Sequence, residues 1–444
     1  MIYITEKKNS SGIYYERKFA STLEAEAIID IIQIKTATTI VDNIHYTYLY
    51  DINMEPISPV FEYLNFELKN SSPNNLTPAI SALKLLFCFL ELFHIQFHAM
   101  RKNDLKKLIL FLEGVPKKGI DYQLNLTTQR SNSTINNYFS VYRSYANFLG
   151  LTNSIFTKKG DFKKHVYIPE SETVMKVPTY EVRLKTYKPE ISTPKYISVE
   201  EFKSILKVIR EEYTLREECI VRLMFESGLR IGEVLGLTNE DIVEKDGNAY
   251  LHIRNRCTDS PYQLAKTCMH VSHPNQYRSK AYRQKDVGYQ VAVISMELLD
   301  KINDYVNASH IPSSTLFERH YAKHTICDNV LGSNEENFYL FINNLGKPLS
   351  ANLWNKTLRT IFKKAGINVD KMHRENNLNH RFRHGFAMFM VKYKHIKTYD
   401  LKLLMRHRSL SSIQHYYRPT DEDIVELKTE FVNSIYEIIP ELSL

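Results

Sequence analysis

Residues 378–387 read Leu-Asn-His-Arg-Phe-Arg-His-Gly-Phe-Ala. His380 and Arg383 are three residues apart, so a helix through this stretch places both on one face, where they can point at one anion. A guanidinium binds a phosphate with a planar pair of donors, and the imidazole beside it is a group that can carry or release a proton near neutral pH. The stretch therefore predicts a phosphate-binding helix face.

Two shorter segments follow it. Residues 403–409 read Leu-Leu-Met-Arg-His-Arg-Ser and contain His407, and residues 413–419 read Ile-Gln-His-Tyr-Tyr-Arg-Pro and contain Tyr416 and Tyr417. A tyrosine presented after a short turn, beside a bound phosphate, can act as a nucleophile once a base removes its proton. His407 alone is equally compatible with a histidine of the core, and either tyrosine can be the exposed one.

A second motif lies upstream, at Ser-Gly-Leu-Arg-Ile-Gly-Glu in residues 227–233. Gly228 ends one predicted helix and Arg230 begins the next. Glu233 lies one turn later, where it can hold the guanidinium. By itself the motif is also compatible with an Arg–Glu pair that only fixes a helix turn.

In this order, the motifs resemble the signature of the tyrosine recombinases, the phage integrase family. That signature reads Thr/Ser-Gly-x-Arg-x-x-Glu, then His-x-x-Arg-His, a Leu-Gly-His-like segment, and a nucleophilic tyrosine nine residues beyond that last histidine. Counting nine residues from His407 reaches Tyr416. The chain departs from the pattern at Met405-Arg406, where the family usually has Leu-Gly.

The resemblance implies a site-specific recombinase or integrase, and it implies the role of each matched residue. Arg230 and Arg383 would bind the non-bridging oxygens of a DNA phosphodiester, supported by Glu233. Tyr416 would attack the phosphorus, His380 would accept its proton, and His407 would hydrogen-bond the phosphate. The resulting 3′-phosphotyrosine conserves the bond energy, so neither a metal nor any other cofactor is expected.

The resemblance also implies a catalytic lysine on a hairpin before an apolar strand. Lys285, before Val-Ala-Val-Ile in residues 291–294, matches best. A polar insert at residues 255–284 leaves the register open, so Lys266, Lys280 and Arg283 remain alternatives. The insert holds Cys257, Cys268, His270 and His273, but their spacing fits no standard zinc site and we predict none.

The predicted fold is mainly α with a small antiparallel β-sheet in the catalytic domain, an α+β class. Four parts are expected: an arm-like segment (1–60), a helical core-binding domain (61–175), a basic linker (176–195) and an integrase-type catalytic domain with a carboxy-terminal helix (196–444). A helix is predicted over residues 23–32, and another is expected to begin at Thr77-Pro78. Strands are predicted at residues 250–254, 290–294 and 338–342.

The first domain carries the predicted DNA-facing residues, which are Arg130, Asn136, Asn137, Arg143 and Lys185. An ordinary solvated face explains them equally well. The lysine-rich residues 156–194 predict an extended connector that follows DNA phosphates. The final helix, at residues 421–438, would dock on a neighbouring protomer or on its own domain.

The bulk properties agree with a DNA-binding protein of the cytoplasm. The 444 residues carry a formal charge of +8, with a pI near 8.9, which favours a basic surface for a polyanion. Five scattered cysteines predict reduced thiols, and no signal or membrane segment is expected, since the apolar run at residues 82–93 is too short to span a bilayer. The predicted partners are double-stranded core recombination sites, further copies of the chain in a tetramer, and a directionality factor.

Two other functions fit parts of the same pattern. A type IB topoisomerase uses the same chemistry to relax supercoils. A DNA-binding architectural protein with an inactive site would keep the fold without the reaction.

Overall fold

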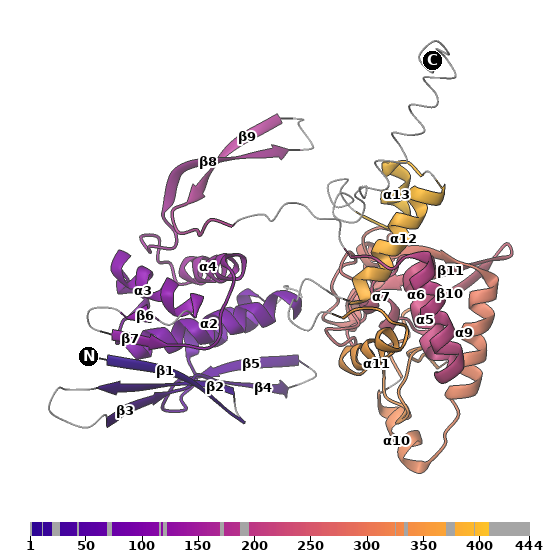
Figure 1. Cartoon of the computed structure of the whole chain (residues 1–444), viewed down its shortest axis with the longest axis horizontal. Coiled ribbons are helices and arrows are strands. Elements are labelled where there is room, and N and C mark those ends of the chain that lie inside the picture. Colours follow the sequence, from indigo (N-terminus) through magenta and orange to yellow (C-terminus); the bar gives the residue numbers. More distant parts are fainter. Residues whose placement is uncertain are drawn as a thin grey trace, which may run out of the picture. The chain divides into compact units, whose positions relative to one another are not determined.

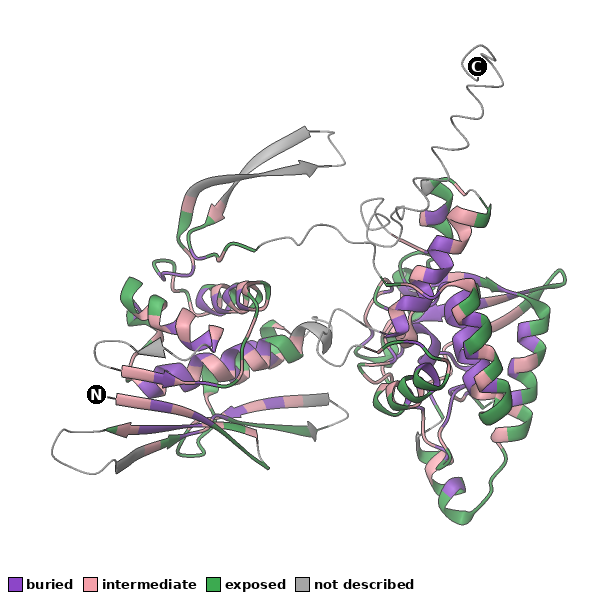
Figure 2. Ribbon diagram, viewed as in Figure 1, coloured by how far each residue is buried: buried purple, intermediate pink, exposed green. Residues whose placement is uncertain are grey.

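The computed structural model describes residues 2–10, 12–19, 27–41, 44–68, 73–114, 117–118, 122–168, 173–186, 195–324, 326–332, 336–369, 378–394 and 396–407. It divides into two compact units, Met1–Pro189 and Glu190–Leu444. Tyr416, Tyr417 and the predicted final helix lie outside the described residues. In both units, buried residues gather on the inward sides of the helices (Figure 2).

The first unit contains a five-stranded sheet of order β3-β2-β1-β7-β6 and a separate β4–β5 hairpin. Strand β1 pairs antiparallel with β2 and parallel with β7. The helices α2 and α4 lie over the sheet (Figure 1), and one apolar core joins the two layers. The strands are β1 (Ile2–Asn9), β2 (Gly12–Phe19), β3 (Ala27–Ile32), β4 (Lys35–Val41), β5 (Ile44–Tyr50), β6 (Lys117–Lys118) and β7 (Tyr122–Asn125).

The helices of this unit are α1 (Ser58–Glu62), η1 (Tyr63–Glu67), α2 (Pro73–Phe93), η2 (Phe97–Ala99), α3 (Lys102–Glu113) and α4 (Asn132–Phe148). By length and composition, α2 would be able to cross a membrane. Its residues Leu83, Leu86 and Phe89 are nevertheless fully buried in the core of the unit. Its apolar character is therefore explained by packing.

Three expectations for this unit are corrected. The segment predicted as a helix at residues 23–32 contains the strand β3, because its isoleucines pair along β2. The helix expected at Thr77-Pro78 begins at Pro73, with Pro78 inside it. Residues 1–60 do not form a separate arm, since Ile4, Tyr15 and Leu49 lie in the same core as the helices.

The expected extended linker is also different. Two segments pair here as antiparallel strands, β8 (Lys159–Ile168) and β9 (Thr173–Tyr180). The runs His-Val-Tyr-Ile and Thr-Val-Met-Lys-Val favour strands, and the lysine content had obscured this signal. The boundary between the two units falls at Pro189, within the predicted linker of 176–195.

The second unit packs helices around α6, which is buried along most of its length. Its helices are α5 (Val199–Glu212), α6 (Leu215–Glu226), α7 (Ile231–Leu235), η3 (Asn239–Asp241), η4 (Pro274–Arg278), α8 (Lys280–Arg283), α9 (Met296–Ser309), α10 (Thr315–His324), α11 (Ala351–Lys364), α12 (Leu378–Lys394) and α13 (Thr398–Leu404). Its antiparallel sheet has the order β10 (Ile242–Lys245), β11 (Asn248–Arg254) and β12 (Tyr289–Ile294).

Most local predictions for this unit are confirmed. The strands at residues 250–254 and 290–294 are present as β11 and β12, and the α+β class is confirmed. The third predicted strand, at 338–342, makes only isolated bridges, such as Tyr339 with Thr238. The third strand of the sheet is β10, which pairs with β11 through a tight turn at Asp246-Gly247.

Candidate active site

Arg230 begins α7 and is fixed there by Glu233. The Glu233 carboxylate accepts the Arg230 backbone N–H at 2.9 Å and its Nη1 at 2.7 Å. Burial alone would raise the pKa of Glu233, but the charges of Arg230, Arg406 and Arg383 outweigh it and lower the pKa to about 2. Glu233 is therefore ionised at neutral pH. The motif predicted its pairing with Arg230, and the structure adds the charges of Arg406 and Arg383.

Arg383 on α12 is fully buried and connects two segments that are far apart in the sequence. Its guanidinium donates to the backbone oxygens of Gly228 and Met405, and its Nη2 lies 3.0 Å from Nε2 of His407. The loop before α7, the helix α12 and the turn after α13 thus meet at one guanidinium. The structure brings Arg230, Arg383 and His407 together.

The two histidines of this cluster are both held neutral. Burial, together with the charges of Arg230, Arg383 and Lys266, lowers the pKa of His380 to about 4. Burial and the charges of Arg383 and Arg230 lower the pKa of His407 to about 3. At neutral pH, His380 is therefore an unprotonated base beside two fixed cations.

Arg406 ends α13 in an unusual backbone conformation. Its N–H donates to Leu403 O at 2.9 Å, and the His407 N–H donates to Lys402 O at 3.0 Å, which is the hydrogen-bond pattern of a Schellman helix end. That pattern requires a left-handed residue, and Arg406 has φ 53°. The conformation costs an L-residue roughly 1–2 kcal/mol, which is why glycine is usual at such a position.

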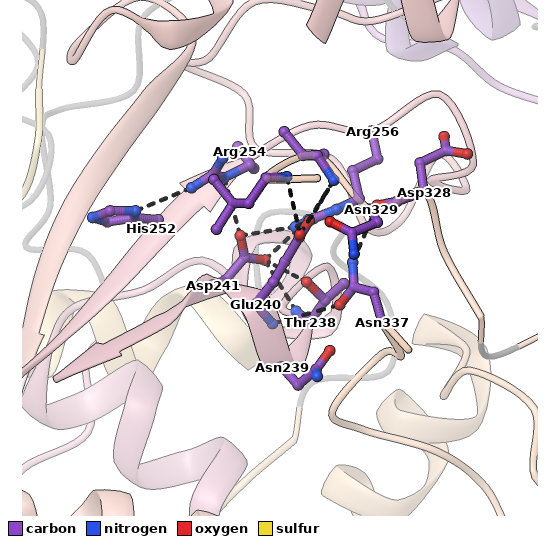
Figure 3. Close-up of polar contacts among 12 residues, drawn as sticks. Thr238, Asn239, Glu240, Asp241, His252, Arg254, Arg256, Asp328, Asn329 and Asn337 are labelled. Atoms are coloured by element: carbon purple, nitrogen blue, oxygen red, sulfur yellow. Dashed lines mark hydrogen bonds and ion pairs between the residues drawn. The ribbon is translucent and has the colours of Figure 1, made fainter. Parts of the chain in front are cut away.

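The insert between β11 and β12 is anchored by buried charges. Arg256 is 1% exposed, and its guanidinium bonds both oxygens of Asp241 at 2.9 Å and Glu240 at 2.8 Å (Figure 3). Burial would lower the pKa of Arg256, but Asp241 and Asp259 raise it well above its usual value. Arg254 also pairs with Asp241, so η3 and the end of β11 are joined by ion pairs.

The insert backbone also packs closely against α7. A Cβ atom at Gly236 would lie 2.3 Å from the carbonyl oxygen of Gln263, and one at Gly232 would lie 2.8 Å from that of Leu264. The Gln263 side chain donates to Leu235 O at 3.3 Å. Gly232 in α7 and Gly236 directly after it therefore allow the insert to approach this helix.

Lys266 belongs to this part of the insert. The buried Asn255 accepts the N–H of Ala265 at 2.6 Å and donates to its carbonyl oxygen at 3.0 Å, directly before Lys266. On the other side, the Thr267 hydroxyl donates to Gln290 at 2.7 Å. Lys266 is thus held between two fixed residues, with its charge acting on His380.

The other three cations considered for the lysine position lie between η4 and β12. Lys280 and Arg283 belong to α8, and Lys285 lies exposed in the turn before β12. Asp286 continues that turn in a left-handed conformation, with φ 67°. Lys266, and not the best sequence match Lys285, is among the charges that act most strongly on His380.

The cysteines of the insert have partners within the chain. Cys257 donates to Asp328 at 2.6 Å, and the buried Cys268 donates to the carbonyl oxygen of Ile253 at 3.2 Å. Among the described residues, no group of three or more histidines, cysteines or carboxylates is placed to hold a metal ion.

The predicted DNA-facing residues of the first unit divide into two groups. Arg130, Asn136 and Arg143 bind the chain's own backbone, at Leu112, Leu184 and Phe156 respectively. Arg143 also stacks on the Tyr180 ring, with its guanidinium carbon 3.8 Å from the ring centroid. The side chains of Asn137 and Lys185 are exposed. Three of the five candidates thus hold the segment after β9 or the loop before α4 in place.

Three residues of the cluster were not predicted from the sequence. Arg406 stood out only as a departure from the family pattern, and neither Asn255 nor Gln290 was among the candidates. Gln290 donates to the Arg406 carbonyl oxygen at 3.4 Å, so it connects the insert to the turn that holds His407. A polar side chain at an inward position of an apolar strand was the sign that could have identified it.

Comparisons with known proteins point to one family. The model of the phage integrase family matches residues 195–423. The chain is 23% identical to transposase A from transposon Tn554 of Staphylococcus aureus, over 86% of this chain and 92% of that protein. It is 22% identical to tyrosine recombinase XerH of Campylobacter jejuni, over 55% of this chain and 54% of that protein.

Solved structures similar to the chain include that of the Tn1549 transposon integrase in complex with transposon right end DNA. The TM-score is 0.49 at 14% sequence identity, and the match covers 84% of this chain and 98% of that one.

Proposed function

The chain belongs to the phage integrase family and is a tyrosine-type site-specific DNA recombinase, and we propose that it cleaves and rejoins DNA through a 3′-phosphotyrosine at Tyr416. The observation that carries the proposal is the convergence of Arg230, Arg383, His380 and His407 around the buried Glu233. These residues come from segments as far apart as residues 230 and 407. An arrangement that served only the core would not need two guanidiniums and two neutral imidazoles at one point.

Each residue has one role in the proposed reaction, and together the roles account for every proton that moves. The Tyr416 oxygen attacks phosphorus and gives its proton to His380, while Arg230 and Arg383 stabilise the charge that develops on the non-bridging oxygens. The 5′-oxygen leaves with a proton from a lysine. In the second step, a 5′-hydroxyl of another strand attacks the phosphotyrosine, and the proton transfers run in reverse. No bond is lost overall, so the reaction needs no nucleotide, metal or other cofactor.

For the lysine we propose Lys266 instead of Lys285. The lowered pKa of His380 supports this assignment, since Lys266 contributes to it. The fixed backbone on both sides of Lys266 supports it further, because a general acid must be held within reach of its acceptor.

The partner is DNA, and the finer details are proposals. Both units would contact one duplex, with the exposed Asn137 and Lys185 on the first unit and the basic β8–β9 hairpin following phosphates. We propose that the protein works as a tetramer on two core sites in the cytoplasm, with a directionality factor. Since the curated relative Tn554 transposase A belongs to a transposon, the substrate would be a mobile element that is integrated or excised.

Family membership supports recombination over the two alternatives, relaxation of supercoils by a type IB topoisomerase and DNA binding without reaction.

A covalent-complex experiment tests the proposal. A binding sequence is first selected by the protein from a random pool of short duplexes. A set of duplexes with this sequence is then made, each with one nick a few nucleotides 3′ of a different phosphate. Cleavage at that phosphate releases the short fragment between it and the nick, which diffuses away, so the covalent complex cannot be reversed. We expect a protein–DNA band that resists denaturant and forms equally well in EDTA. Complete inhibition by the chelator would contradict a reaction without metal, and tight binding with no covalent band would favour the architectural alternative.

The lysine assignment predicts a specific rescue. Lys266→Ala should slow cleavage by about 10²–10⁴-fold, the usual contribution of a positioned general acid. A duplex with sulfur in place of the leaving 5′-oxygen should restore most of the rate, because a thiolate leaves without a proton. Lys285→Ala is the matched control and should cleave both duplexes at the wild-type rate. The reverse pattern would assign the role to Lys285.

A further inference from the structure

Arg406 occupies a helix end where glycine would fit without strain, and its side chain nevertheless reaches into the catalytic cluster. We propose that Arg406 is a positioning residue, which fastens the turn carrying His407 to the segment carrying Arg230 and Glu233. The inference rests on the proposed function, since the step that it serves is DNA cleavage.

The side chain of Arg406 bridges the two segments directly. Its Nη1 donates to Ser227 O at 3.2 Å and to Leu404 O at 3.3 Å. Its Nη2 donates to Gly228 O at 3.4 Å and pairs with the Glu233 carboxylate at 3.4 Å. The guanidinium is nearly buried, with the side chain 7% exposed. One residue thus connects both sides of the cluster through a planar group.

The backbone of Arg406 is fixed as well. Its left-handed φ of 53° completes the helix end that orients His407, and its carbonyl oxygen accepts a hydrogen bond from Gln290 at 3.4 Å. A bond to Gln290 also fixes Thr267, the residue after Lys266. Through Gln290, the backbone of Arg406 is therefore connected to the segment that carries Lys266, while its side chain bonds the segment that carries Arg230.

These contacts distinguish a positioning role from a direct one. Both terminal nitrogens of Arg406 already bond oxygens of the chain, and its Nε is buried. A phosphate would have to displace those contacts to be bound. Arg230, by comparison, bonds Glu233 through its Nη1 at 2.7 Å, and its side chain is 14% exposed, twice the exposed fraction of the Arg406 side chain.

Two variants separate the side chain from the backbone. Arg406→Ala and Arg406→Gly both remove the guanidinium, but glycine also relieves the left-handed strain, so Arg406→Gly should melt at a higher temperature than Arg406→Ala. Both should nevertheless cleave the nicked duplex about 10²-fold more slowly in a single turnover, because a small displacement of a catalytic group is enough for such a loss. Their dissociation constants for the intact duplex should stay within about two-fold of wild type, since Arg406 does not contact DNA.

Two further variants complete the design. Arg406→Lys keeps a cation beside Glu233 but lacks the two terminal nitrogens of the planar guanidinium. It should therefore cleave faster than Arg406→Ala and more slowly than wild type. Lys207→Ala removes an exposed cation on α5 and controls for overall charge, with no expected change in rate. Wild-type cleavage by Arg406→Gly would overturn the proposal, because it would show that only the backbone matters.

A measurement without DNA keeps this test independent of the proposed function. In the free protein, Arg406→Gly should speed amide hydrogen exchange at residues 228–233 and 404–407 together, while exchange in α9 stays unchanged. If the wild-type protein formed no covalent complex, the proposed function would fail. The positioning role would still stand if Arg406→Gly exchanged faster than wild type in both segments. Unchanged exchange in both segments would overturn the role itself.

Discussion

Replacing Tyr416 by phenylalanine is expected to abolish the covalent protein–DNA complex and to leave DNA binding intact. Phenylalanine keeps the ring and removes the one oxygen that can attack phosphorus, so no slower route through the same residue remains. Binding depends on guanidiniums, lysines and backbone groups that this change does not touch. The measurement compares covalent band formation on the nicked duplex with the dissociation constant for the intact duplex.

Tyr417→Phe is the matched control, because it makes the same change one residue later. It should form the covalent complex at the wild-type rate. If Tyr417→Phe lost the complex and Tyr416→Phe kept it, the register counted from His407 would be wrong by one residue.

The second large effect is expected at the two arginines that would bind the phosphate. Arg230→Ala and Arg383→Ala should each slow cleavage by about 10²–10³-fold, the loss typical for removing one donor that stabilises charge in a transition state. Equilibrium binding of the duplex should weaken far less, because many other contacts to phosphates persist. Single-turnover rates and salt-matched titrations on the same duplex measure the two effects separately.

The arginine variants need a check on folding, above all at Arg383. Its guanidinium is fully buried and supports Gly228, Met405 and His407, so its loss leaves carbonyl oxygens without a donor. Arg383→Lys retains the charge and should fold more stably than Arg383→Ala, but it lacks the fork that bonds both segments. Equal losses in rate and binding for the Arg230 variant, which is less buried, would show that these residues only position DNA.

The arginine, histidine and glutamate residues of the candidate site could be selected from the sequence, because the proposed chemistry needs fixed residue types at short spacings. Glu233 lies three residues from Arg230, and Arg383 lies three residues from His380, so helical geometry alone relates them. The sequence could not show that Arg383 bonds Gly228 and Met405 at once, because those contacts cross most of the second unit. Long-range pairing of this kind depends on how the helices pack.

At the lysine position, the spacing and the structure favour different residues. Lys285 matched best because it precedes an apolar strand, and that rule assumes a short hairpin. Here the hairpin is opened by a folded insert, which Arg256 and Asn255 hold through buried contacts. Glycines at 232 and 236 then let the insert lie against α7. Lys266, the lysine that we propose for this role, belongs to the insert, and its charge helps to lower the pKa of His380.

The first unit was harder to predict because several of its polar residues serve the fold. Asn136 exchanges two hydrogen bonds with the backbone of Leu184, and Arg143 stacks on Tyr180, so a polar stripe on α4 was not a free surface. The lysines of β8 suggested an extended connector, although the β-branched and aromatic residues among them pair across a hairpin. Charge alone did not distinguish a linker from a strand.

The most direct test of the account is to identify both ends of the covalent bond. The complex formed on the nicked duplex is digested with protease and nuclease, and the remaining nucleotide–peptide is sequenced by mass spectrometry. We expect the nucleotide on Tyr416, attached through its 3′-phosphate. A nucleotide on any other residue, or a link through a 5′-phosphate, would contradict the proposed mechanism.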